Sequence, residues 1–150
     1  MIELRSISIR QPWLDLILRG KKKFELREWN PDFRGPVALH SPIRIDFHAA
    51  HFFGYREPCK LECGKVLGIA NLTSVTEFNE ERYVQTLTEH LSIQPFTRII
   101  YAISFSDILV LPHPIAAKGK QLLFTLEEEI SKKIINQLPP NNTFNLIHQL

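Results

Sequence analysis

The sequence has few cysteines, no long apolar run and little net charge, and each shortage narrows the kind of protein it can be. Cys59 and Cys63 are its only cysteines, too few for a disulfide framework, so we expect free thiols and a reducing compartment. No apolar run approaches the roughly 20 residues of a membrane span, and the start "MIELRSIS" lacks the apolar block of a signal peptide. We therefore expect a cytoplasmic protein that does not act in a membrane.

The net charge is small, but the charged residues are unevenly distributed along the chain. The net charge is +2, which does not by itself indicate a nucleic-acid binder. Residues 1–27 nevertheless hold seven Lys or Arg and three acids, whereas residues 77–90 hold four Glu and one Arg. A locally basic face is one interpretation, and solvated charges on unrelated faces are the other.

The length and composition predict one domain. With 150 residues, 44% of them hydrophobic, the chain can bury one real core. It has no internal repeat, low-complexity tract or Pro/Ser-rich linker that would divide it. We expect a single domain over residues 1–138, followed by a partly disordered tail at 139–150 behind Pro139-Pro140.

The periodicity of apolar residues predicts strands interrupted by short helices. Strands are expected at 2–9, 24–28, 37–41, 65–75, 98–112 and 121–126, the fifth ended by its prolines Pro112 and Pro114. Helices are expected from Pro12 to a stop at Gly20, from Ser41-Pro42 to about Phe53, over 80–91 and over 127–138. Without a regular βαβ alternation, this order favours an α+β fold in which the strands curl into a small barrel flanked by helices.

The stretch "GKKKFELR", residues 20–27, is the most unusual one in the chain. Its period-two alternation predicts that Glu25 and Arg27 share one face, while Phe24 and Leu26 face the barrel core. The helix stop before it would bring Lys22 to the same place. We expect these polar residues at the rim of a solvent-filled cleft.

This stretch and its surroundings resemble the opening of ASCH domains, which are named for activating-signal-cointegrator homology and grouped with the PUA-like barrels. The resemblance rests on "SIRQPW", on the Gly-x-Lys-x-x-Glu-x-Arg motif at residues 20–27, and on the strand "VALHSP". The later "GKVLGIANLTSV" and "PIAAKGKQLLFTL" resemble the second half of small stand-alone members. The resemblance therefore covers most of residues 4–126.

The resemblance implies a PUA-like β-barrel with flanking helices, a cleft that carries the motif, and RNA or a modified nucleoside as the partner. Some members are described as amidohydrolases that act on N4-acetylcytidine, and others as proposed ribonucleases or RNA-binding modules. In the amidohydrolases a threonine three residues after the lysine is the proposed nucleophile, and this chain has Glu25 there. The departure favours recognition or general-base chemistry over nucleophilic catalysis.

Lys22 and Glu25 are the predicted catalytic residues. A carboxylate nearby keeps a lysine charged, which suits phosphate or carbonyl recognition, while Glu25 could bond an exocyclic amine or activate a water. The alternative is a surface ion-pair ladder worth about 0–1 kcal/mol. The other predicted ligand-binding residues are Arg10, Gln11, Arg27, Trp29, Ser41, Lys118 and Lys120. Trp13 is expected to pack in the core, whereas Trp29 could equally stack on a base.

The sequence also contains candidates for a zinc site and for a catalytic histidine. His48, His51, Cys59 and Cys63 are zinc-type ligands close together in the sequence, but their order is not a strong signature. We predict no metal and no cofactor. His40 lies in an apolar run and suits either a core position or a catalyst beside the cleft.

Two classes of function remain for the sequence. The first is recognition of RNA or a modified nucleoside, with metal-independent hydrolysis of the same ligands left open. The second is a non-enzymatic interaction domain in a transcription or translation complex, which would need an exposed apolar patch. The oligomeric state is not indicated.

Overall fold

The structure, a computed structural model, describes residues 2–146. The strands are β1 (Arg5–Ser8), β2 (Phe24–Arg27), β3 (Gly35–Ser41), β4 (Lys65–Phe78), β5 (Ile100–Ala116) and β6 (Leu123–Thr125). The helices are α1 (Trp13–Leu18), α2 (Phe47–Phe52), α3 (Glu80–Gln85), α4 (Leu87–His90) and α5 (Glu128–Ile135), with a 3₁₀ turn η1 (Pro58–Lys60).

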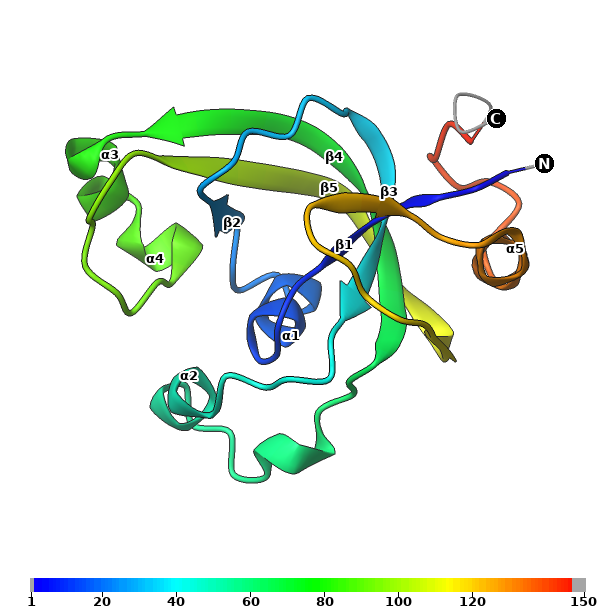
Figure 1. Cartoon of the computed structure of the whole chain (residues 1–150), viewed down its shortest axis with the longest axis horizontal. Coiled ribbons are helices and arrows are strands. Elements are labelled where there is room, and N and C mark those ends of the chain that lie inside the picture. The colour runs from blue at the N-terminus through cyan, green and yellow to red at the C-terminus, as the bar shows by residue number, and fades with distance from the viewer. Residues whose placement is uncertain (1, 147–150) are drawn as a thin grey trace.

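The six strands form one curved sheet in the order β2-β5-β4-β3-β1-β6. Among the described strands β1 and β3 pair in parallel, and the other neighbours are antiparallel. The long strands β4 and β5 arch over α1, and α3 and α4 lie at one end of the arch (Figure 1). This confirms the expected α+β class. Within residues 2–146 no ladder joins β2 to β6, so the barrel-like sheet stays open.

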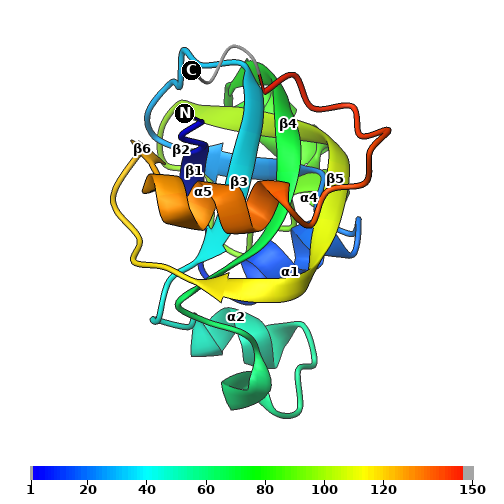
Figure 2. The same cartoon turned by 90° about the vertical axis from the view of Figure 1, so that its right-hand side faces the viewer.

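The sheet separates two hydrophobic clusters. Alternate residues of β3 point to opposite faces, so Val37 and Leu39 join the first cluster while Ala38 joins the second. The first cluster packs around Leu14 and Ile17 of α1. The second packs around Ile134 of α5, the helix that crosses in front of β1 and β3 in Figure 2. The first cluster therefore lies between the sheet and α1, and the second lies between the sheet and α5.

The predicted end of the fifth strand is wrong, because β5 continues through both of its prolines to Ala116. Its ladder with β4 has a register shift here: Val110 pairs with Gly68, and the next pair is Ile115 with Val66. The ladder of β5 with β2 involves only residues 101–104. Proline is tolerated at an edge or a bulge, where no ladder needs its missing N–H.

Two helix predictions also need correction. The second helix begins at Phe47 and not near Pro42, because Ser41 still belongs to β3 and Asp46 is the N-cap, whose side chain accepts from the Ala49 N–H at 3.0 Å. The predicted helix over 80–91 is divided into α3 and α4 at Thr86. The hydroxyl of Thr86 donates to the Arg82 carbonyl at 2.7 Å, a bond that competes with regular helix geometry.

The C-terminal part of the chain remains a prediction in two respects. The domain boundary at residue 138 and a disordered tail at 139–150 are not tested, and residues 147–150 lie outside the described residues. Phe144 and Leu146 pack against the second cluster. Separately, none of the helices in the described range has the length and apolar character needed to cross a membrane.

Candidate functional site

Lys22, Glu25 and Arg27 form one ion cluster between α1 and β2. The backbone turns at Gly20, which has a φ of 76°, and the Lys22 N–H then donates to the Leu16 carbonyl at 3.1 Å. Lys22 Nζ lies 3.7 Å from Oε1 of Glu25, and Arg27 donates to Oε2 from its Nε at 3.3 Å and from its Nη2 at 2.9 Å. Helix end and strand alternation thus bring the three charges together as the sequence predicts.

The prediction that this cluster lies at the rim of a solvent-filled cleft is wrong. The side chains of Lys22, Glu25 and Arg27 are 3%, 11% and 21% exposed. Phe24 and Leu26, expected in the core, are only half-buried, and Phe24 packs edge-on against Phe78 at 5.3 Å. The alternation reveals which side chains share a face, but the elements that cover this face come from elsewhere in the chain.

Lys22 is the most deeply buried charge of the cluster. Its ammonium donates to the carbonyl of His90, at the end of α4, and lies 5.0 Å from the ring centroid of Trp13. Burial lowers the pKa of Lys22, and this effect outweighs the opposing attraction of Glu25. His90 is itself buried, with Nε2 facing the Tyr83 carbonyl at 2.8 Å, and burial lowers its pKa. No sequence signal linked His90, 68 residues away, to the motif.

Ser8 connects the ion cluster to a second polar pair. Its carbonyl accepts from Nη2 of Arg27 at 2.7 Å, and its hydroxyl lies 2.8 Å from Nδ1 of His40. Nε2 of His40 lies 2.7 Å from the carbonyl of Ala117, which can only accept, so Nε2 carries the proton. Burial lowers the pKa of His40 and favours this neutral ring, whose Nδ1 is then an acceptor for the Ser8 hydroxyl.

A groove of about 1100 Å³ opens beside Ser8 and His40. Its wall includes Lys118, Gly119 and Lys120, the loop between β5 and β6. The loop passes so close that a Cβ on Gly119 would lie 2.6 Å from the Ser8 hydroxyl and 2.7 Å from a His40 ring carbon. Only glycine fits there, and the approach brings two exposed cations to the groove.

The remaining predicted ligand-binding residues are less available. Gln11 is buried, with its amide committed to the Glu62 carbonyl at 3.1 Å and to the Asp15 N–H at 2.9 Å. Ser41 is buried and donates to the same carbonyl of Glu62. Both side chains hold the chain together near the ends of β1 and β3, and these bonds make them poor candidates for contact with a ligand.

Arg10 and Trp29 stay accessible to different degrees. Arg10 is exposed, and its Nη2 makes a long contact of 3.5 Å with the carbonyl of Ile45. Trp29 is half-buried against the first cluster, with its ring centroid 6.0 Å from the Arg27 guanidinium carbon. Trp13 packs against the same cluster, as expected, but its ring also contacts Lys22.

The four zinc-type residues do not assemble. Cys59 is exposed and Cys63 is half-buried, and burial raises the pKa of the Cys63 thiol. His48 and His51 lie on exposed positions of α2. Across residues 2–146, no group of three or more His, Cys, Asp or Glu side chains has an arrangement that could hold a metal ion.

Comparison with known proteins places this architecture in a family. The sequence model of the ASCH domain matches residues 7–135, which is most of the chain. The chain belongs to the ASCH family. This confirms the family suggested by the sequence, and it is a family associated with RNA binding. A search of curated proteins gave no significant match.

Solved ASCH structures share the fold. The crystal structure of ASCH from Zymomonas mobilis has a TM-score of 0.63 and 16% identity, with 88% of this chain and 93% of that chain covered. A serine-to-alanine variant of the Zymomonas mobilis protein also gives 0.63 and 16%, covering 88% and 94%, and a tyrosine-to-phenylalanine variant gives 0.62 and 17%, covering 88% and 96%. At this identity the likeness shows the fold alone, so the function of this ASCH domain depends on its own residues.

Proposed function

We propose that this ASCH domain recognises single-stranded RNA, or a modified nucleoside within it, at a site centred on Ser8. The observation that carries the proposal is that Arg27 of the motif donates to the carbonyl of Ser8, whose hydroxyl bonds His40 beside the groove. The ion cluster and the basic loop are therefore parts of one continuous polar site. Lys118 and Lys120 would meet backbone phosphates, while the less buried atoms of Glu25 and Arg27 would read a base edge.

The energetics of the ion cluster support a functional role. Removing charges from water costs several kcal/mol per ion, and buried ion pairs are often no more stabilising than apolar residues of the same size. A domain that needed only stability could fill the positions of Lys22 and Glu25 with apolar side chains. Perturbed and buried ionisable groups gather at functional sites, which makes ligand recognition the better explanation.

Salt-dependent RNA binding tests this proposal. We expect the affinity for a short oligouridylate to fall as salt rises, because each neutralised phosphate releases counterions, with a log–log slope of about 0.7 per contact. Lys118→Ala and Lys120→Ala should each reduce the slope by about 0.7, the value for one phosphate contact. Lys60→Ala is the matched control, since Lys60 is an exposed cation paired with Glu57 and lies outside the groove. A slope that the loop variants leave unchanged would contradict the placement of phosphates at this loop.

Hydrolysis of an acylated nucleoside is the second candidate function, and the Ser8–His40 hydrogen bond favours it. In this reaction the Ser8 hydroxyl attacks the acyl carbon while Nδ1 of His40 takes its proton. The bond from the acyl carbon to the nucleoside nitrogen then breaks, and the proton passes from His40 to the leaving amine. Water cleaves the acyl-serine ester, which releases the carboxylic acid and restores Ser8.

Glu25 offers a different route, in which its carboxylate activates the water directly and Lys22, paired with it at 3.7 Å, holds it in place. Two variants separate the routes. Ser8→Ala should abolish turnover of acylated nucleosides in the first route and spare it in the second, whereas Glu25→Gln should stop the second. If the wild-type protein binds the nucleoside but forms no product, its function is recognition without hydrolysis. If neither RNA nor nucleoside binds at any salt, the alternative of an interaction domain in a transcription or translation complex is favoured.

A further inference from the structure

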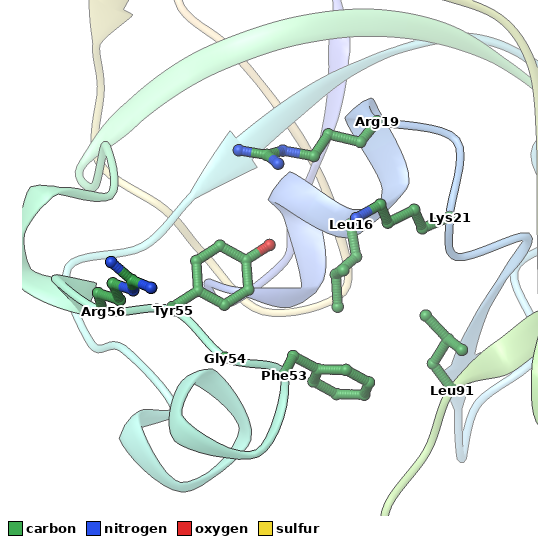
Figure 3. Close-up of a pocket in the computed structure, with 8 residues that line it drawn as sticks. All are labelled: Leu16, Arg19, Lys21, Phe53, Gly54, Tyr55, Arg56 and Leu91. Atoms are coloured by element: carbon green, nitrogen blue, oxygen red, sulfur yellow. The ribbon is translucent and has the colours of Figure 1, made fainter.

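A second pocket, of about 570 Å³, lies between α1 and the segment that follows α2 (Figure 3). It is separate from the groove beside His40 and shares no lining residue with it. The pocket combines cationic and apolar side chains: Arg19, Lys21 and Arg56, together with Leu16, Phe53, Tyr55 and Leu91. Its volume is within the range of small-ligand sites.

The cations of this pocket are poorly neutralised. Asp15 contacts two of the lining residues through one oxygen, because Oδ2 accepts from the Tyr55 hydroxyl at 2.6 Å and pairs with Nε of Arg19 at 2.9 Å. Neither Lys21 nor Arg56 forms an ion pair with any residue in the range 2–146, and both are exposed. The pocket therefore presents a surplus of positive charge to an anion.

The apolar part is held in a fixed orientation. The Phe53 ring packs edge-on against Trp13 at 5.5 Å and against Phe52 at 5.1 Å. The Tyr55 ring is fixed by its hydrogen bond to Asp15. In Figure 3, Arg19 lies above the Tyr55 ring and Arg56 to its left, while Phe53 and Leu91 lie below and to the right of it. An anionic group at one end and a flat apolar group at the other would match this arrangement.

The pocket is also adjacent to the ion cluster. Trp13 packs edge-on against Phe53 of the pocket at 5.5 Å, and its ring centroid lies 5.0 Å from Lys22 Nζ of the cluster. Lys21 and Lys22 both donate their backbone N–H to the carbonyl of Leu16, and their side chains then go to the pocket and the cluster respectively. Trp13 therefore lies between the ion cluster and the pocket and contacts both.

We propose that this pocket binds one nucleotide of a single-stranded RNA, another part of which occupies the site centred on Ser8. The inference rests on the proposed function. The phosphate lies against the guanidinium groups of Arg19 and Arg56, which can each bind it through two hydrogen bonds, and Lys21 adds charge. The base stacks on Phe53, because every base has a flat apolar face that suits an aromatic ring. An acidic peptide would satisfy the cations but would leave this ring without a stacking partner.

The test compares an oligouridylate of about six nucleotides with uridine alone, using fluorescence anisotropy and a salt series. Arg56→Ala should weaken binding of the oligonucleotide about tenfold and reduce the salt slope by about 0.7, one phosphate contact. Phe53→Leu keeps apolar volume but removes the ring, so it should weaken oligonucleotide binding about tenfold without changing the slope. Both variants should bind uridine as the wild-type protein does.

Matched controls come from the same molecule. Phe47→Leu alters an exposed ring of α2 that is outside the pocket, and Lys132→Ala removes an exposed cation on α5. Neither should change the affinity. Ultraviolet crosslinking of the bound oligouridylate should attach it to the peptide that contains Phe53 and Arg56.

The outcomes separate this inference from the proposed function. If the wild-type protein binds the oligonucleotide while Arg56→Ala and Phe53→Leu bind it equally well, the pocket assignment is wrong and the proposed function stands. If the wild-type protein binds no RNA, both fail. The nucleotide assignment would be overturned in favour of an acidic peptide by two results together. Polyglutamate would compete with RNA for the wild-type protein, and Arg56→Ala would lose polyglutamate binding while Phe53→Leu would keep it.

Discussion

Lys21 and Lys22 are consecutive in the chain, yet Lys21 lines an exposed pocket and Lys22 is buried against the carbonyl of His90 and the carboxylate of Glu25. The turn after α1 separates them, since both N–H groups donate to the one carbonyl of Leu16, at 2.9 Å and 3.1 Å. Two lysines that look equivalent in the sequence therefore have different surroundings and should respond differently to substitution.

Lys22→Ala is expected to destabilise the protein by about 3–5 kcal/mol, because it leaves the buried carboxylate of Glu25 without one of its two cations and the His90 carbonyl without a donor. This differs from the expectation for a lysine at the rim of a solvent-filled cleft. Urea denaturation measures the free energy of unfolding. Lys21→Ala is the control and should change it by less than about 0.5 kcal/mol, as exposed substitutions usually do. Equal effects of the two variants would show that Lys22 is not buried as described.

Glu25→Gln is expected to lower the pKa of Lys22 further. Burial already lowers this pKa, and the negative charge of Glu25 is the main influence that raises it. A neutral amide removes the attraction while Arg27 continues to repel the ammonium. Titration of the Lys22 side chain by NMR in both proteins checks the direction. A pKa that stays the same or rises in the variant would mean that Glu25 does not stabilise the charged lysine.

Acid should destabilise the folded protein partly through His40. Burial lowers the pKa of His40 below its ordinary 6.5, so the unfolded chain binds this proton first as the pH falls. The free energy of unfolding therefore decreases from about pH 6.5 down to the folded pKa. His40→Gln should make this decrease shallower, although His90, whose pKa is also lowered, still contributes. His48→Gln, on an exposed position, should leave the slope as in the wild-type protein, and a steep slope retained in His40→Gln would contradict the prediction.

Gly119→Ala should displace the loop that carries Lys118 and Lys120. The added methyl group would lie 2.6 Å from the Ser8 hydroxyl, closer than any real contact, so either the loop or the Ser8–His40 pair must move. We expect a loss of about 1–3 kcal/mol in stability and weaker RNA binding. Lys118→Ala, in the same loop, is the comparison: it should weaken binding at unchanged stability. Unchanged unfolding and binding in Gly119→Ala would show that the loop does not approach Ser8 this closely.

Local patterns predicted much of this fold. The alternation in residues 24–27 predicts β2 and the shared face of Glu25 and Arg27, and Gly20 predicts the end of α1, because strand period and left-handed backbone depend on neighbouring residues only. The motif also indicated the family. Local signals misled where the surrounding structure overrides them: β5 passes its prolines at a register shift, and Thr86 divides a helix that the periodicity makes continuous.

What covers each side chain was decided by tertiary structure. Lys22 has its partner in His90, Ser8 has its partner in His40, and the Phe53 ring is held by Trp13, all across chain separations that no local pattern records. The sequence by itself determined which charges could meet in residues 20–27. Only the folding of β1, α1 and the turn after α4 over that face determined that they meet out of water, because burial and desolvation depend on contacts between distant segments.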